Sequence, residues 1–151
     1  MFLSKTSEYA IRLIFYLLKE GDNCHYIRLR KIAPELGVSF YQLTKVAQKL
    51  IQAGILESYT GPNGGVTLKQ NSDGIRLIDI VAPIEGGGLF DKCMLGLGEC
   101  GDGDPCPVHE YWEDTMLRLK RLFNEITLEE MREHYPMGRL SQKQKKGNLN
   151  D

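Results

Sequence analysis

The chain has 151 residues, 42% of them hydrophobic and 26% charged, so it can bury one core and is expected to form one domain with an appendage. Its formal net charge of −1 averages three unlike regions. Residues 1–75 and 115–151 have an excess of Lys and Arg, whereas residues 76–114 carry nine acidic against two basic side chains. The sequence lacks an apolar run of roughly 18 residues and a signal-peptide pattern, which excludes a membrane protein and predicts a soluble, cytoplasmic protein with reduced thiols.

The first two helices are predicted from apolar periodicity. Residues 3–20 form one helical stripe, with Ser4 or Thr6 as the N-cap and Gly21 as the stop. Residues 27–37 predict a shorter helix that ends at Gly37, although Pro34 removes a backbone donor within it. The positions expected to be buried are Ala10, Leu13, Ile14, Leu17, Leu18, Leu29, Ile32, Ala33 and Leu36.

Residues 39–68 predict a capped helix followed by a β-hairpin. Ser39 and Gln42 have the spacing of a capping box, and Gly54 is expected to end the helix. Two β-prone runs then flank the glycine-rich segment 61–65, which predicts a hairpin with a tight tip. The buried face of the helix should carry Leu43, Val46, Ala47, Leu50 and Ile51, and its polar face Tyr41, Gln42, Thr44, Lys45, Gln48 and Lys49.

The order helix, short helix, glycine turn, capped helix and hairpin predicts a winged helix-turn-helix, in a mostly α fold with a small β-hairpin wing. In this fold the second helix of the motif enters the major groove of DNA, and the wing contacts the adjacent backbone or minor groove. The alternative is a plain packing unit, since most amphipathic helices have a polar face for solubility alone. The candidate DNA-binding residues are Lys5, Arg28, Ser39, Tyr41, Gln42, Thr44, Lys45, Lys49, Thr60, Asn63 and Gly64.

The C-terminal half predicts a long helix. A short helix through Ile75, Ile78 and Val81 should be closed by Pro83 and the glycines at 86–88, and from Val108 onward apolar residues recur at spacings of three and four. Because a chain of this size has little left to bury that seam, we expect the long helix to pair with a second copy. The alternative is a helix folded back on its own domain. The predicted dimerisation residues are Trp112, Met116, Leu119 and Phe123.

Three of the four cysteines lie close together, in the pattern C-x6-C-x5-C-x2-H formed by Cys93, Cys100, Cys106 and His109. With Cys106 as an N-cap and Pro107 at the first helical position, Cys106 and His109 would share one helical turn. Structural zinc sites usually pair their ligands at shorter spacings, so an iron-sulfur cluster is favoured over zinc, and metal-free thiol sensing is the third alternative.

Together these motifs resemble the Rrf-type bacterial regulators over about residues 1–135. The resemblance is carried by the wing at Gly61–Gly65, the three-cysteine loop and a long helix followed by NEITLEEM. The ending Cys-Pro-Val-His is most similar to the iron-sulfur cluster regulator branch, IscR, which implies a [2Fe-2S] cluster held by Cys93, Cys100, Cys106 and His109. The nitric-oxide-sensing branch, NsrR, is also similar; there an acidic side chain of the partner subunit can be the fourth ligand, which implies Glu8 as the alternative.

Three positions depart from the IscR pattern. One extra residue separates the first two cysteines, which makes a [4Fe-4S] cluster the alternative type. Thr60 replaces an arginine of the wing, and Thr44 stands at the position of an acidic residue that helps discriminate between DNA sites. The resemblance therefore implies a different preferred operator.

We therefore expect a homodimeric, iron-sulfur-sensing transcriptional regulator, acting as a repressor on double-stranded operator DNA. The expected units are a winged helix-turn-helix at 1–83, a cysteine-rich loop at 84–107, the dimerisation helix and a short final helix at 108–135, and a disordered tail at 136–151. Thr127 and Glu130 match a capping box for that final helix. The alternatives are a zinc- or thiol-based DNA-binding regulator and, in another class, an iron-sulfur electron-transfer protein. An enzyme is not expected, because the sequence has neither a phosphate loop nor a nucleophile elbow.

Overall fold

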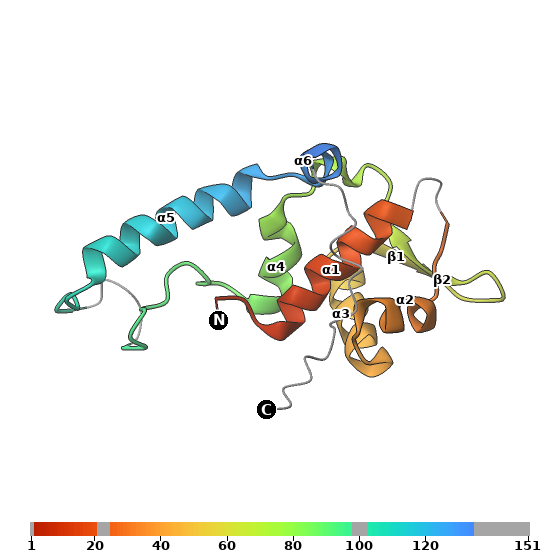
Figure 1. The fold of residues 1–151 in the computed structure, drawn as a ribbon, viewed down its shortest axis with the longest axis horizontal. Coiled ribbons are helices and arrows are strands. Elements are labelled where there is room, and N and C mark those ends of the chain that lie inside the picture. Colours follow the sequence, from red (N-terminus) through yellow and green to blue (C-terminus); the bar gives the residue numbers. More distant parts are fainter. Residues whose placement is uncertain (1, 21–24, 98–102, 135–151) are drawn as a thin grey trace, which may run out of the picture.

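The computed structural model describes residues 2–20, 25–97 and 103–134. Strands β1 (Leu56–Tyr59) and β2 (Gly65–Leu68) pair antiparallel, with Leu56 opposite Leu68. In the part of the chain that is described, the order of elements confirms the mostly α fold with a small hairpin wing (Figure 1). The helices are α1 (Lys5–Glu20), α2 (Leu29–Leu36), α3 (Phe40–Gln52), η1 (Ser72–Gly74), α4 (Leu77–Glu85), α5 (His109–Glu125) and α6 (Leu128–His134).

The main core forms where α1 packs against α2, α3, α4 and β2. The predicted stripe of α1 is buried at every position, and the Ser4 hydroxyl caps the helix by accepting a hydrogen bond from the Ser7 backbone N–H at 3.2 Å. Pro34 lies inside α2, and Gly37 ends that helix with φ 64°, as predicted. The buried core residues of α1, α2 and α3 are Ala10, Leu13, Ile14, Leu17, Leu18, Ile32, Ala33, Leu36, Leu43, Val46, Ala47 and Leu50.

The helix α3 and the wing follow the predicted pattern closely. Ser39 accepts a hydrogen bond from the Gln42 backbone N–H at 3.2 Å, which confirms the predicted cap. Val66 of β2 exchanges two backbone hydrogen bonds of 2.9 Å with Ile27 of the segment before α2. A Cβ on Gly65 would lie 2.4 Å from the Ile27 carbonyl, so only a glycine allows the strand to come this close.

Two boundaries in the C-terminal half differ from the sequence-based expectation. Pro83 lies inside α4 and does not close it; the helix continues to Glu85 and ends at Gly86, the first of the three glycines predicted to close it, whose φ is 77°. Cys106 is not the N-cap of α5, because the His109 backbone N–H donates to the Cys106 carbonyl at 2.9 Å in a separate turn. The helix α5 therefore begins at His109, two residues later than predicted.

The helix α5 extends away from the main helical body as an arm, and α6 returns the chain to that body (Figure 1). The return is fixed by two backbone hydrogen bonds, from Leu77 to the Ile126 carbonyl at 3.0 Å and from Leu128 to the Ile75 carbonyl at 2.8 Å. Both halves of the predicted Thr127–Glu130 capping box are present, at 3.1 and 3.3 Å. Residues 136–151, predicted as a disordered tail, lie outside the described residues.

Candidate nucleic-acid interface and cysteine site

The exposed face of α3 carries four of the eleven residues predicted to contact DNA. Tyr41 is 67% exposed, and the Lys45 ammonium lies 4.4 Å from the centre of its ring. Gln42 and Lys49 are exposed as well. Thr44 differs, because it is partly buried on the flank of the helix and its hydroxyl donates to the Phe40 carbonyl at 2.8 Å. Ser39 contributes its hydroxyl to the helix cap.

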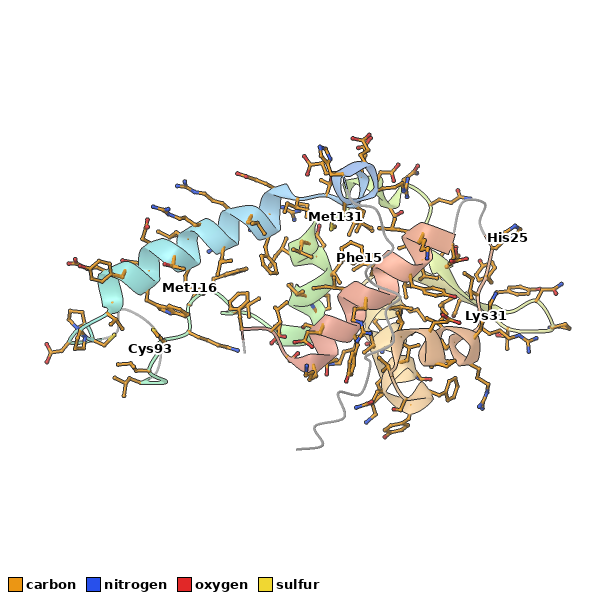
Figure 2. The ribbon with its side chains drawn as sticks, in the orientation of Figure 1. Phe15, His25, Lys31, Cys93, Met116 and Met131 are labelled. Carbon is orange, nitrogen blue, oxygen red and sulfur yellow. The ribbon has the colours of Figure 1, made fainter. Side chains whose placement is uncertain are left out.

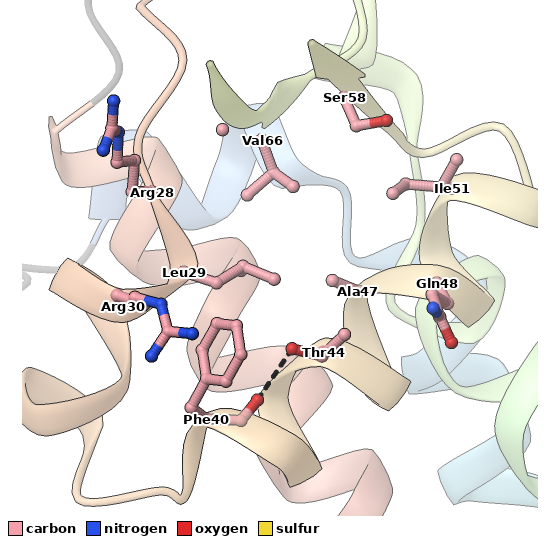
Figure 3. Close-up of a pocket in the computed structure, with 11 residues that line it drawn as sticks. Arg28, Leu29, Arg30, Phe40, Thr44, Ala47, Gln48, Ile51, Ser58 and Val66 are labelled. Carbon is pink, nitrogen blue, oxygen red and sulfur yellow. Dashed lines mark hydrogen bonds between the residues drawn. The ribbon is translucent and has the colours of Figure 1, made fainter. Parts of the chain in front are cut away.

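A groove of about 360 Å³ separates this flank of α3 from the wing (Figure 3). Its lining is mostly apolar. Of its two charged residues, Arg28 lies just before α2 and Arg30 lies in the first turn of that helix. The Arg28 guanidinium donates a hydrogen bond to the Pro62 carbonyl in the tip of the wing. The Arg30 guanidinium lies over the Phe40 ring, 4.2 Å from its centre. The groove residues are Arg28, Leu29, Arg30, Phe40, Thr44, Ala47, Gln48, Ile51, Ser58, Gly65 and Val66.

The remaining predicted DNA-binding residues lie at the wing tip and at the start of α1. Thr60 and Asn63 are exposed, whereas Gly64 is buried, and a Cβ there would lie 2.3 Å from the Tyr59 carbonyl oxygen. Gly64 therefore shapes the tip instead of presenting a side chain. Lys5 forms an ion pair of 2.8 Å with Glu8, and this hydrogen-bonded partner raises the pKa of Lys5.

The cysteine loop brings Cys93 and Cys106 into hydrogen-bond contact, although the two are far apart in the sequence. Both side chains are partly exposed. Hydrogen bonds from the Leu97 and Leu95 backbone N–H groups lower the pKa of the Cys93 thiol, with a smaller contribution from Cys106, because they stabilise the thiolate. Figure 2 places Cys93 beneath the arm formed by α5, away from α1 to α3.

The other candidate ligands are only partly placed. His109 is the first residue of α5, and its Nε2 lies 3.8 Å from the Glu113 carboxylate. Glu8 lies in the first turn of α1, where its carboxylate forms an ion pair with the Lys5 ammonium. Cys100 and Cys24 lie outside the described residues. Within residues 2–20, 25–97 and 103–134, no three His, Cys, Asp or Glu side chains converge on one point.

The predicted dimerisation seam on α5 is largely covered by its own chain. Met116 and Phe123 are 5% and 6% exposed, and the Phe123 ring packs against Phe90 at 5.4 Å and Phe2 at 5.9 Å. The Trp112 indole donates to the Lys92 carbonyl at 2.8 Å. The premise that one chain cannot bury this seam is therefore wrong, because the segment before Cys93 folds back over it. Leu119 is half-buried, and the large apolar side chains of α5 that stay exposed are Tyr111, Leu117 and Leu122.

Comparison with known proteins gives the family. Residues 3–134 match the model of Rrf2, the iron-dependent transcriptional regulators. The chain belongs to the Rrf2 family. It is 30% identical over 131 residues to the HTH-type transcriptional regulator IscR of Vibrio campbellii, in an alignment that covers 87% of this chain and 77% of that relative.

Solved structures of the Rrf2 family agree on the fold. CymR, the global cysteine regulator of B. subtilis, superimposes with a TM-score of 0.72 at 23% identity, over 88% of this chain and 97% of that one. IscR of T. potens has a TM-score of 0.69 at 22% identity, over 93% of both chains. The matching family model and the Vibrio campbellii relative are transcriptional regulators, which confirms a DNA-binding regulator and not an enzyme. None of the described helices is long and apolar enough to span a bilayer.

Sequence reasoning missed three members of this Rrf2-family site. Phe40 was not singled out, although it falls outside the buried face of α3 and is 40% exposed. Arg30 counted only as part of the basic excess, and its stacking on Phe40 depends on how α2 and α3 pack. Trp112 was assigned to a dimer seam, whereas its indole holds the cysteine loop. The available signal for Phe40 was an aromatic residue outside the buried face of α3.

Proposed function

We propose that this Rrf2-family chain binds operator DNA as a homodimer and that its cysteine loop holds an iron-sulfur cluster, with [2Fe-2S] as the expected type. The observation that supports the sensor is the contact between Cys93 and Cys106, beside the first turn of α5. Two thiols held together in a shell of backbone N–H groups, with an imidazole three residues further on, fit the donors that cluster iron takes.

The ligands of the proposed site are Cys93, Cys100, Cys106 and His109, with Glu8 of the partner subunit as the competing fourth ligand. A bound cluster supplies one-electron redox chemistry. The chain's own contribution is to orient the sulfur atoms and to stabilise their negative charge through the Leu95 and Leu97 N–H groups. The short segment between Leu97 and Gly103 carries Cys100 and contains glycines, which let a chain wrap closely around a compact group.

The same loop is joined to α5 on both sides of the cysteine pair. Lys92 accepts a hydrogen bond from Trp112, and Cys106 accepts one from His109. A change in the separation of the two sulfur atoms therefore acts on the first turns of α5. Since coupling between two sites is typically worth about 1 to 3 kcal/mol, we expect roughly 5- to 150-fold changes in operator affinity.

Dimer formation through α5 is proposed from its remaining exposed apolar residues. Tyr111 is 80% exposed, and Leu122 lies eleven residues, or about three helical turns, further along the same face. A twofold pair of α5 helices would present two α3 helices to DNA half-sites about one helical turn apart, roughly 34 Å. A single copy would read only one half-site.

The first experiment is a visible absorption spectrum, with iron and sulfide counts, of protein purified without oxygen. A coloured protein with equal iron and sulfide supports the cluster, and their number per chain separates two-iron from four-iron types. Cys106→Ala should lose the iron and remain folded, whereas Cys24→Ala, outside the loop in sequence, should keep it. A Cys106→Ala protein with full iron content would show that the ligand set is wrong.

A thiol switch is the second candidate, and the direct Cys93–Cys106 contact favours it. Hydrogen peroxide would oxidise the two thiols to a disulfide, with two electrons and two protons passing to the peroxide to give two molecules of water. A colourless, iron-free protein that forms a Cys93–Cys106 disulfide, seen by mass spectrometry as a loss of two hydrogen masses, would establish this function. A colourless protein with bound zinc would instead support a zinc-based regulator.

A further inference from the structure

We propose that the groove between α3 and the wing seats the sugar-phosphate backbone of one operator strand, with Arg28 and Arg30 as its phosphate ligands. This inference rests on the proposed DNA-binding function and adds a contact beyond the exposed face of α3 and the wing tip. It gives a specific contact to Arg30, which the sequence offers only as one of several basic residues, and a functional role to Phe40, which the sequence did not identify.

The groove combines an apolar floor with two positively charged side chains. A floor made of Leu29, Phe40, Ala47, Ile51 and Val66 is apolar, yet it opens on the same flank as the predicted recognition surface. A DNA strand has matching chemistry, because apolar deoxyribose carbons alternate with anionic phosphates along it. Burial of the sugar against the floor and of the phosphate oxygens against arginine would satisfy both kinds of surface.

The charge of the groove lining is positive. Both ionisable side chains in the lining are arginines, and none of the described residues that line the groove is acidic. The hydroxyl of Thr44 is already bonded to the Phe40 carbonyl, so it does not compete for a phosphate. A groove with only positive charge is complementary to a polyanion, and guanidinium groups match phosphate oxygens bidentately.

Both arginines are held in place by contacts within the protein before DNA binds. Arg28 is bonded to the Pro62 carbonyl, and Arg30 is stacked on the Phe40 ring at 4.2 Å. Each guanidinium has five N–H donors, so these contacts leave donors available for phosphate oxygens. Because the side chains are already ordered, less conformational entropy is lost when the phosphate binds. The wing and the start of α3 therefore act as supports for the two arginines.

The test compares Arg30→Gln with Arg132→Gln, which removes the same charge from an exposed arginine of α6, outside the groove and the α5 face. Binding is measured by fluorescence anisotropy against a mixed-sequence duplex and against an operator selected from a random pool, at salt concentrations between about 50 and 200 mM. We expect Arg30→Gln to weaken both complexes by about the same factor, on the order of 10-fold, and to reduce the salt slope by about two for a dimer. Arg132→Gln should leave both quantities at their wild-type values.

A second variant separates the stacking from the charge. Phe40→Leu keeps an apolar floor but removes the ring under Arg30, so we expect a several-fold loss of affinity with an unchanged salt slope. A strand in which single phosphates are replaced by neutral methylphosphonates locates the contact. One position in each half-site should weaken binding by the wild type but not by Arg30→Gln. Should Arg30→Gln fail to fold, Arg30→Met, which also removes the charge but keeps an unbranched apolar side chain over the Phe40 ring, takes its place in this comparison.

Several results would overturn the inference. If Arg30→Gln behaves like Arg132→Gln on both duplexes, the groove does not hold the backbone. If the loss is confined to the selected operator, Arg30 contacts bases and not phosphates, which also contradicts the proposal. If wild-type protein binds neither duplex, the proposed DNA-binding function itself fails, and this outcome is distinct because it precedes any comparison of variants.

Discussion

Replacing Gly65 by alanine tests how the wing is attached to the helical body. Gly65 has φ 151°, and an added Cβ would lie 2.4 Å from the carbonyl carbon and oxygen of Ile27. Real Cβ atoms almost never approach another atom closer than 3.0 Å, so the strand must move away from Ile27. That movement acts directly on the two 2.9 Å hydrogen bonds between Ile27 and the neighbouring Val66.

The expected loss of stability has two parts. The strained backbone conformation costs about 1 to 3 kcal/mol. The two weakened hydrogen bonds cost about 0.5 to 1.5 kcal/mol each. The Gly65→Ala protein should therefore unfold with a free energy lower by about 2 to 6 kcal/mol, which corresponds to a melting temperature lower by roughly 4 to 24 °C in a chain of this size.

Urea or thermal unfolding measures this loss, and Gly61→Ala is the matched control. Gly61 also has a positive φ, 131°, but the nearest atom to its added Cβ is a side-chain carbon of Tyr59 at 3.8 Å. Gly61→Ala should thus show the backbone strain alone. Equal destabilisation by the two substitutions would refute the reasoning, because the contact with Ile27 would then contribute nothing.

Three further predictions concern the cysteine loop, the core and the recognition helix. The chain has a single tryptophan, so alkylation of the loop thiols should shift the fluorescence of Trp112; an unchanged spectrum would mean that its bond to Lys92 does not report on the loop. Burial raises the pKa of Glu85, but hydrogen bonds from Ser4 and Ser7 outweigh burial and lower this pKa overall. The Glu85 carboxylate therefore stabilises the fold above about pH 4.5, and this stabilisation is lost as the pH falls through the folded pKa. Ser7→Ala should therefore cost about 1 to 2 kcal/mol at pH 7 and less below pH 4, in urea unfolding at the two pH values, and a pH-independent cost would contradict this account. Lys45→Ala should weaken operator binding and flatten its salt dependence, and an unchanged titration would move the DNA contact away from this face of α3.

Periodicity and turn chemistry predicted most of the local structure, because these signals act within one or two helical turns. Ser39 and Thr127 cap their helices as expected, and Gly37 ends α2. The errors fall where a proline allows more than one outcome. Pro83 is accommodated inside α4, and the turn after Cys106 delays the start of α5 until His109.

The candidate site could be predicted only in part. The spacing of the cysteines indicated a shared site, and the structure brings Cys93 and Cys106 together within the described residues. It did not indicate that Lys92 would be bonded to Trp112, because that contact joins segments twenty residues apart. Likewise, the polar face of α3 followed from its periodicity, whereas the groove beside it exists only because α2, α3 and the wing meet there.

The sequence by itself determined the order of elements, the capped recognition helix, the glycine-rich wing and the sulfur-rich loop, since each depends on residues that are neighbours along the chain. The tertiary structure alone decided what covers the seam of α5 and which cation stacks on which ring. Phe123 is buried by Phe2 and Phe90 of its own chain, and Arg30 lies over Phe40. Amphipathic periodicity shows that a helix face will be buried, but the partner depends on packing between distant segments, which periodicity does not encode.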